Sequence, residues 1–391
     1  MSTRPGIVIV GGGPAGLAAA RAYREHGGGL PVTILAAEPR APYQRPPLSK
    51  ELLRGELEEH ELALEQPGWY EQQRIDLHAG ATVTALDTGG RAIEIDGAGS
   101  FAYEACVLAT GSEPMRLPVP GAEHPGIATL RCLEDWRALS AHGARVAVIG
   151  TGFIGCEAAA SFAARGARVT LLGEEALPQQ SRLGDEAGER LRGWLEGEGI
   201  ELRLGGEVTA IEPAPGGGWL VHAGGQASPV SVDTVLQAVG AAPRVELARD
   251  AGLALRDGAV LADERMRTSA AGVFVAGDLA FAVNAAAGRR LRVEHWGEAL
   301  GQGAVAGAGM ARADARWATA PGFWSTIARR TLKYVAWGDG YEHVRVDDHR
   351  GRAFTAWYSD RRGICVGALC HDRDEDYERG RELIEAGEPA P

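Results

Sequence analysis

The feature that most constrains the fold of this chain is a pattern that occurs twice: a β-branched strand, a glycine-rich turn and an alanine-rich helix. The first copy reads GIVIVGGGPAGLAAARAYREHG, with a strand predicted at residues 7–10. Its turn has the spacing GxGxxG at Gly11, Gly13 and Gly16. Such glycines allow a tight turn, a close backbone approach to a pyrophosphate and close packing of helix on strand. A dinucleotide-binding βαβ unit is therefore predicted at the start of the chain.

The second copy reads RVAVIGTGFIGCEAAASFAARGARVTLLGEE. The same spacing recurs at Gly150, Gly152 and Gly155, between a strand predicted at 146–149 and a helix that ends near Arg165. The two copies lie too far apart for a solenoid repeat, so they indicate two separate nucleotide-binding domains. Transfer of electrons between two bound cofactors, from a nicotinamide to a flavin, is the expected chemistry.

A carboxylate lies at the end of the second strand of each unit, where a ribose is expected to bind. Glu38 lies near the end of the segment VTILAAEP, and Glu174 lies near the end of LLGEE. A carboxylate at the second site favours the free ribose hydroxyl of NAD over the phosphate of NADP. A register shifted by one residue would place Gly173 at this position instead. A further buried strand, in GVFVAGDLA, delivers Asp278 at its carboxyl end, as suits a hydrogen bond to the ribityl chain of a flavin.

Four segments in this order, PYQRPPLSK, GTGFIGCE, VFVAGDLA and RVEHWGEA, resemble the flavin-dependent ferredoxin reductases. These are the NADH-driven reductase components of Rieske-type oxygenases and of cytochrome monooxygenase systems. Apoptosis-inducing-factor-like proteins share the pattern. The resemblance covers nearly the whole chain and implies two Rossmann-like domains of the glutathione-reductase type plus a C-terminal α+β domain, an α/β fold overall. The implied FAD domain is discontinuous, at 1–115 and 242–318, with an NAD domain at 116–241 and a C-terminal domain at 319–391.

The resemblance also implies the site residues. Those implied for FAD are Gly11, Gly13, Ala15, Gly16, Glu38, Arg45, Lys50, Val83, Thr110, Gly111, Arg131, Asp278 and Trp296. Those implied for NAD are Gly150, Gly152, Phe153, Ile154, Gly155, Glu157, Glu174 and Gly240. Lys50, Glu157 and Trp296 are implied next to the reacting rings, with Glu157 facing Lys50 across the nicotinamide pocket.

Lys50 is unusual by composition alone. Of 40 basic residues only Lys50 and Lys333 are lysines, and Lys50 follows the rigid pair Pro46 and Pro47. A compact ammonium near a flavin would tune the ring by its charge. The simpler alternatives are a surface lysine and, for Glu157, a carboxylate stabilised only by the helix macrodipole.

The cysteine content bears on the cell compartment of the protein and on how electrons leave its flavin. The five cysteines are Cys106, Cys132, Cys156, Cys365 and Cys370, an odd count without a CxxC pair. This predicts a reducing, cytoplasmic compartment and no disulfide framework. No cysteine lies in the region of residues 40–50, where disulfide-reducing flavoproteins carry one, so electrons are expected to leave the flavin singly. No apolar run is long enough to span a bilayer.

The net charge of −12 argues against a general nucleic-acid binder. Residues 289–362 nevertheless hold 13 basic and 8 acidic residues, a local charge of +5. This segment is either a docking face for an acidic partner or an arginine-rich solvated surface.

The sequence predicts a reductase that takes hydride from NADH onto FAD and passes electrons singly to a [2Fe–2S] ferredoxin serving an oxygenase, as a monomer or homodimer. Three alternatives remain: an apoptosis-inducing-factor-like NADH oxidoreductase with a signalling or assembly role, a pathway-specific flavin reductase of a small molecule, and a non-catalytic FAD-bound binding module.

Overall fold

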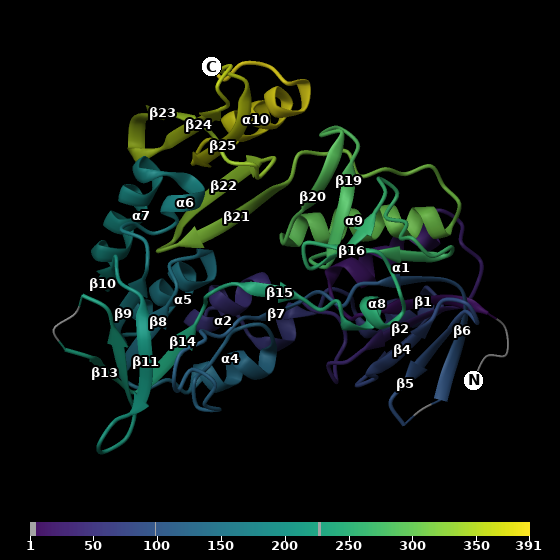
Figure 1. Cartoon of the computed structure of the whole chain (residues 1–391), viewed down its shortest axis with the longest axis horizontal. Helices are drawn as coiled ribbons and strands as arrows, with labels where there is room; N and C mark the ends of the chain where they lie inside the picture. Colours follow the sequence, from purple (N-terminus) through teal and green to yellow (C-terminus); the bar gives the residue numbers. More distant parts are fainter. Residues whose placement is uncertain (1–4, 98, 226–227) are drawn as a thin grey trace.

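The computed structural model describes residues 5–97, 99–225 and 228–391 and contains three sheet-based parts (Figure 1). The first sheet, on the right of the figure, runs in parallel through β3-β2-β1-β6 and on to β18, while the hairpin β5–β4 continues antiparallel from the first half of β6. Its strands are β1 (Gly6–Val10), β2 (Val32–Ala36), β3 (Ile75–Ala79), β4 (Val83–Asp87), β5 (Ala92–Ile95), β6 (Gly99–Leu108) and β18 (Val273–Val275). Every residue of β1 and β18 is buried, as expected for strands covered on both faces.

Two helices from distant parts of the chain pack side by side against this sheet. They are α1 (Pro14–Glu25) and α9 (Trp296–Met310). Glycines on α9 let the helices approach closely, because a Cβ at Gly303 would lie 2.2 Å from the carbonyl oxygen of Ala15. A smaller sheet completes this part; its strands, in spatial order, are β16 (Leu255–Arg256), β17 (Ala259–Ala262), β19 (Ala280–Asn284) and β20 (Arg289–Arg292).

The second part, on the left of Figure 1, holds the second βαβ unit. Its parallel sheet consists, in spatial order, of β10 (Glu201–Leu204), β9 (Arg168–Gly173), β8 (Arg145–Ile149) and β14 (Thr234–Gln237). Next to it is a three-stranded antiparallel sheet of β11 (Val208–Pro213), β12 (Trp219–Ala223) and β13 (Val230–Val232). The segment ELRL, although it directly precedes this small sheet in the sequence, belongs to the parallel sheet: it forms β10 and pairs with β9.

A short ladder joins the first two parts. β7 (Ser112–Pro114) pairs antiparallel with β15 (Ala241–Pro243), so the chain leaves the first part and returns to it side by side. The predicted domain limits fall at this ladder, after residues 115 and 241, and remain a prediction.

The third part is an antiparallel sheet with one long helix, α10 (Asp374–Ala386), packed on it at the top of Figure 1. Its strands, in spatial order, are β21 (Gly322–Ile327), β22 (Arg330–Ala336), β25 (Cys365–His371), β24 (Phe354–Ser359) and β23 (His343–Asp348). Four of these strands coincide with short apolar or alternating segments of the sequence, whereas β21 does not show such a pattern. The reason is an inverted pattern: Ser325 is buried, whereas its neighbour Trp324 is 44% exposed.

The remaining helices connect and cover these sheets. They are η1 (Pro46–Ser49), α2 (Glu51–Arg54), η2 (Glu59–Leu62), α3 (Pro67–Gln72), α4 (Leu133–Ser140), α5 (Phe153–Ala164), α6 (Gln180–Leu183), α7 (Asp185–Gly197), α8 (Glu246–Asp250) and η3 (Arg350–Arg352). Within the described ranges, no helix combines the length and the apolar character needed to cross a membrane.

Candidate active site

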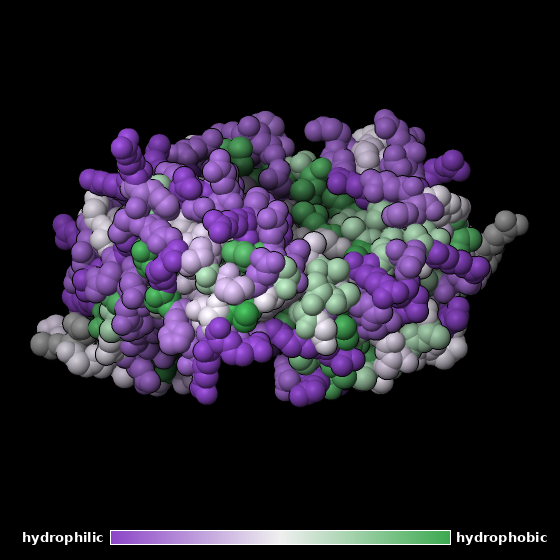
Figure 2. Space-filling view, turned by 90° about the horizontal axis from the view of Figure 1, so that it is seen from above, coloured by the Kyte–Doolittle hydropathy of each residue, from purple (hydrophilic) through white to green (hydrophobic). Residues whose placement is uncertain are grey.

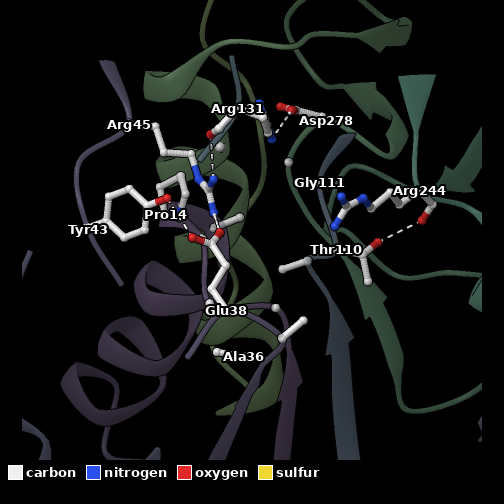
Figure 3. A pocket seen from close by; sticks show the side chains of 18 of the residues that line it. Pro14, Ala36, Glu38, Tyr43, Arg45, Thr110, Gly111, Arg131, Arg244 and Asp278 are labelled. Carbon is white, nitrogen blue, oxygen red and sulfur yellow. Dashed lines mark hydrogen bonds and ion pairs between the residues drawn. The ribbon is translucent and has the colours of Figure 1, made fainter. Parts of the chain in front are cut away.

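A deep cavity lies at the carboxyl ends of β1, β6 and β18, and we call it the first cavity (Figure 3). The turn from β1 into α1 forms one wall, with Gly11, Gly13 and Ala15 at the surface of the cavity. A Cβ at Gly13 would meet nothing within 4 Å, so the backbone there faces open space. Gly16 does not line the cavity. Its Cβ would lie 2.2 Å from the carbonyl oxygen of Gly11, so this glycine serves helix packing and not the approach of a ligand.

Glu38 lines the first cavity with its carboxylate held by two neighbours (Figure 3). Tyr43 donates its hydroxyl at 2.7 Å, and Arg45 forms an ion pair with the same carboxylate. Burial opposes ionisation of Glu38, but the charge of Arg45 and these hydrogen bonds outweigh it and lower its pKa. Arg45 also donates to the backbone oxygen of Arg131 at 2.8 Å. Glu38 is therefore a fixed anion with part of its hydrogen-bonding capacity already used.

Asp278 follows β18 and points into the same cavity beside Arg131 (Figure 3). Its Oδ2 accepts from Ser112 at 2.6 Å and from the Arg131 guanidinium at 3.0 Å. No hydrogen bond to Oδ1 is found among the described residues. That oxygen remains available to a hydroxyl group of a ligand.

The other predicted residues of this site also lie at the first cavity. Val83, Thr110, Gly111, Lys50 and Trp296 all line it. The Thr110 hydroxyl, however, donates to the backbone oxygen of Arg244 at 2.8 Å and so ties two loops together.

The second cavity lies at the turn from β8 into α5 and repeats this construction. Gly150, Gly152, Phe153, Ile154 and Gly240 line it, and a Cβ at Gly152 would again meet nothing within 4 Å.

Gly155 lies behind this turn, as Gly16 does in the first unit. Its Cβ would come within 1.9 Å of the carbonyl oxygen of Gly150. Glu174 is exposed at the far end of the second cavity, next to Glu175 and Arg182.

The two cavities adjoin. The residues that line both are Pro46, Leu130, Arg131, Ile154, Glu294, His295 and Trp296. Two flat ring systems, one in each cavity, would meet at this junction. His295 precedes α9 and packs against Phe323, with 4.4 Å between the centroids of the two rings. Burial and the positive charge of Arg182 lower the pKa of His295 to about 4, so its imidazole is neutral near pH 7.

A buried ion pair lies at the wall of the first cavity. Lys50 Nζ is 2.9 Å from Glu157 Oε2, and the two side chains are 7% and 5% exposed. Ser49 donates to the same oxygen at 2.5 Å, and Ser325 donates to Glu157 Oε1 at 2.7 Å. Sequence reasoning paired Lys50 with Glu157 across a pocket; the structure brings them into direct contact. It assigned neither serine a role at the site, because serines carry no signal of their own in these segments.

None of the five cysteines, all of which are described and free, lines either cavity. Burial raises the pKa of Cys106 to about 12, and it also raises the pKa of Cys156. Such thiols are poor nucleophiles. The described residues also contain no cluster of side chains suited to a metal ion.

The residues present fit two dinucleotides. Each cavity begins at a helix N-terminus with an open glycine cradle, and each has a carboxylate at its far end. The first cavity adds Asp278, with a free oxygen, and the ammonium of Lys50.

Comparison with known proteins agrees with this construction. Residues 5–303 match the family model described as pyridine nucleotide-disulphide oxidoreductase. The ferredoxin--NAD(+) reductase component of the anthranilate 1,2-dioxygenase system of Burkholderia cepacia is 34% identical over 99% of this chain and 95% of its own length. Rubredoxin-NAD(+) reductase of Pseudomonas putida is 33% identical over 84% of this chain and 85% of its own length.

The fold is also that of solved reductases. The structure matches the crystal structure of the covalent putidaredoxin reductase–putidaredoxin complex with a TM-score of 0.92 and 27% identity, covering 99% of this chain and 94% of the matched chain. Fold, glycine turns and relatives agree: the chain belongs to the pyridine nucleotide-disulphide oxidoreductase family.

Proposed function

We propose that the protein is an NADH-dependent flavoprotein reductase that passes electrons singly to a [2Fe–2S] ferredoxin serving an oxygenase. The observation that carries this proposal is the junction of two dinucleotide cavities without a cysteine beside it. FAD, bound in the first cavity, supplies the ability to accept a hydride and to release electrons one at a time. A relative of nearly full length is named as a ferredoxin--NAD(+) reductase component, which supports the choice of acceptor.

The chain's own residues would bind both cofactors, orient their rings and tune the flavin by charge. Gly11 and Gly13 would receive the FAD pyrophosphate at the N-terminus of α1, and Asp278 would accept from the ribityl chain. Gly150 and Gly152 would do the same for the pyrophosphate of NADH at α5. Lys50 would place a positive charge near the flavin ring.

His295 and Trp296 would enclose the reacting rings and exclude water from the junction.

We propose NADH over NADPH as the donor. Glu174 and Glu175 line the far end of the second cavity and would repel the 2′-phosphate of NADPH. Arg182 lines the same region, so the two nucleotides have to be compared directly. The five free cysteines support the proposed cytoplasmic location, where thiols stay reduced.

Most of the basic side chains in segment 289–362 are paired with carboxylates. Nine of its 13 basic side chains form ion pairs with acidic neighbours. The four for which no ion pair is found among the described residues are Arg290, Arg312, Arg350 and Arg352. One face of the molecule is mostly hydrophilic, with hydrophobic residues gathered toward its middle (Figure 2).

The test follows from the proposal. The purified protein should be yellow and should bleach with NADH much faster than with NADPH. Reduction of cytochrome c should then require an added [2Fe–2S] ferredoxin. Fast reduction of cytochrome c or of a quinone without ferredoxin would contradict a protein carrier, and absence of bleaching with either nucleotide would favour a binding module. Rubredoxin is a second acceptor to include, since one relative is named for it.

A further inference from the structure

We propose that Ser325 is a positioning residue for hydride transfer, through which the third part of the molecule holds the Glu157 carboxylate in place against Lys50. This inference rests on the proposed function, because it assigns a role in the reduction of FAD by NADH. It adds a residue from outside both dinucleotide-binding parts.

The geometry divides the Glu157 carboxylate between two sets of donors. Oε2 accepts from Lys50 at 2.9 Å and from Ser49 at 2.5 Å, whereas Oε1 accepts from Ser325 at 2.7 Å. Donors on both oxygens fix the rotation of the carboxylate about its terminal bond. Loss of Ser325 would leave Oε1 without its hydroxyl donor and free the group to turn.

These groups are removed from water. The relative exposures are 6% for Ser49, 5% for Lys50, 4% for Glu157 and 1% for Ser325. Water therefore cannot readily replace the Ser325 hydroxyl. A charge-assisted hydrogen bond in such surroundings is stronger than one between neutral groups.

The carboxylate and its two hydroxyl donors come from three different elements. Ser49 ends η1 of the first part, Glu157 lies in α5 of the second, and Ser325 lies in β21 of the third. One turn further along α5, Ser161 donates to the backbone oxygen of Ser49 at 2.7 Å and reinforces the first contact. The carboxylate is thus a point at which all three parts meet.

β21 also connects this point with the second cavity. Neighbouring residues of a strand point to opposite faces, and Trp324 lines the second cavity while Ser325 faces Glu157. The position of β21 therefore affects both the NADH cavity and the carboxylate that holds Lys50. A purely structural role for Ser325 would change stability without changing the rate at which flavin is reduced.

The experiment compares Ser325→Ala with the parent and with two companions in rapid-reaction measurements of flavin reduction by NADH. Ser325→Thr restores a hydroxyl. Thr326→Ala is the matched control, because the Thr326 hydroxyl pairs with Thr331 within the same sheet. We expect the limiting reduction rate of Ser325→Ala to fall about 10-fold, while the dissociation constant for NADH changes by less than about 2-fold. Ser325→Thr should recover most of the rate, and Thr326→Ala should match the parent.

Two further readouts separate positioning from stability. The FAD midpoint potential should shift in Ser325→Ala if Lys50 moves relative to the ring, whereas bound FAD content should stay full. In a Glu157→Gln background, Ser325→Ala should slow reduction little further, because it acts through the carboxylate.

An unchanged rate and potential in a fully flavinated Ser325→Ala would overturn the inference, as would an equal slowing in the Glu157→Gln background. If Ser325→Ala does not fold, Ser325→Cys keeps a similar volume with a weak donor and gives the same comparison. If the parent itself is not reduced by NADH, the proposed function fails, which is a different result.

Discussion

Replacing Lys50 by methionine should destabilise the protein by about 3–5 kcal/mol, because it removes one partner of a buried ion pair. At 2.9 Å the attraction between the two charges is about 6 kcal/mol for an effective dielectric constant of about 20. Most of this offsets the cost of burying both groups. Without Lys50, the Glu157 carboxylate keeps only the hydroxyls of Ser49 and Ser325.

Removing both charges should cost much less than the two single changes added together. In the double variant Lys50→Met with Glu157→Gln, no uncompensated charge remains buried, and we expect a loss of about 1–2 kcal/mol. The coupling energy from the cycle should therefore exceed about 2 kcal/mol. Reduction of flavin by NADH should be slow in all three variants, because the ammonium is absent or loses its anchor.

The assay is chemical unfolding of the four proteins at one fixed excess of FAD, since the bound cofactor itself adds stability. Flavin fluorescence and far-UV circular dichroism report on the cofactor and on the backbone. A loss below about 1 kcal/mol for Lys50→Met, or effects that add within about 0.5 kcal/mol, would refute the buried pair. Reduction at the parent rate would show that Lys50 has a structural role only.

Three other outcomes are expected. Gly155→Ala should abolish NADH binding while FAD stays bound, because the added Cβ would meet the Gly150 carbonyl. Gly152→Ala should fold normally and bind NADH more weakly. Nucleotide titrations would distinguish the two variants. Glu174→Ala should raise KM for NADH and lower the preference over NADPH, as steady-state kinetics would show. The pKa of His295 is about 4 in the folded protein and about 6.5 in the unfolded chain, so the free energy of unfolding should decrease by about 3 kcal/mol as the pH falls between these values. His295→Gln should reduce this loss, as unfolding curves recorded from pH 7 to pH 4 would show.

Local patterns made much of the fold predictable from the sequence. The glycine turns at Gly11 and Gly150 lie where the spacing placed them, between a buried strand and a helix. The hairpin of β4 and β5 also follows an alternating segment with a Gly-Gly turn, and α10 follows an acidic, helix-compatible segment. β21 could not be predicted in this way, because a buried serine beside an exposed tryptophan reverses the usual alternation of the strand.

The candidate site was predictable only in part. Nineteen of the 21 predicted site residues line a cavity, and they were found through motifs that are contiguous in sequence or through the family resemblance. The role of Gly16 and Gly155 as packing residues became clear only when the space around each Cα was known. The contact between Ser325 and Glu157 spans 168 positions, and no periodicity or spacing connects residues so far apart.

The close packing of α1 on α9 has a consequence for biosynthesis. The N-terminal helix cannot be covered until residues 296–310 leave the ribosome, and β18 must arrive before the second half of β6 gains its partner on that side. At about 5–20 residues per second, the nascent first part waits roughly 15–60 s in an incomplete state. During that time its strand edge is open to other chains. The second part, by contrast, is complete within one continuous segment and can fold while the first still waits.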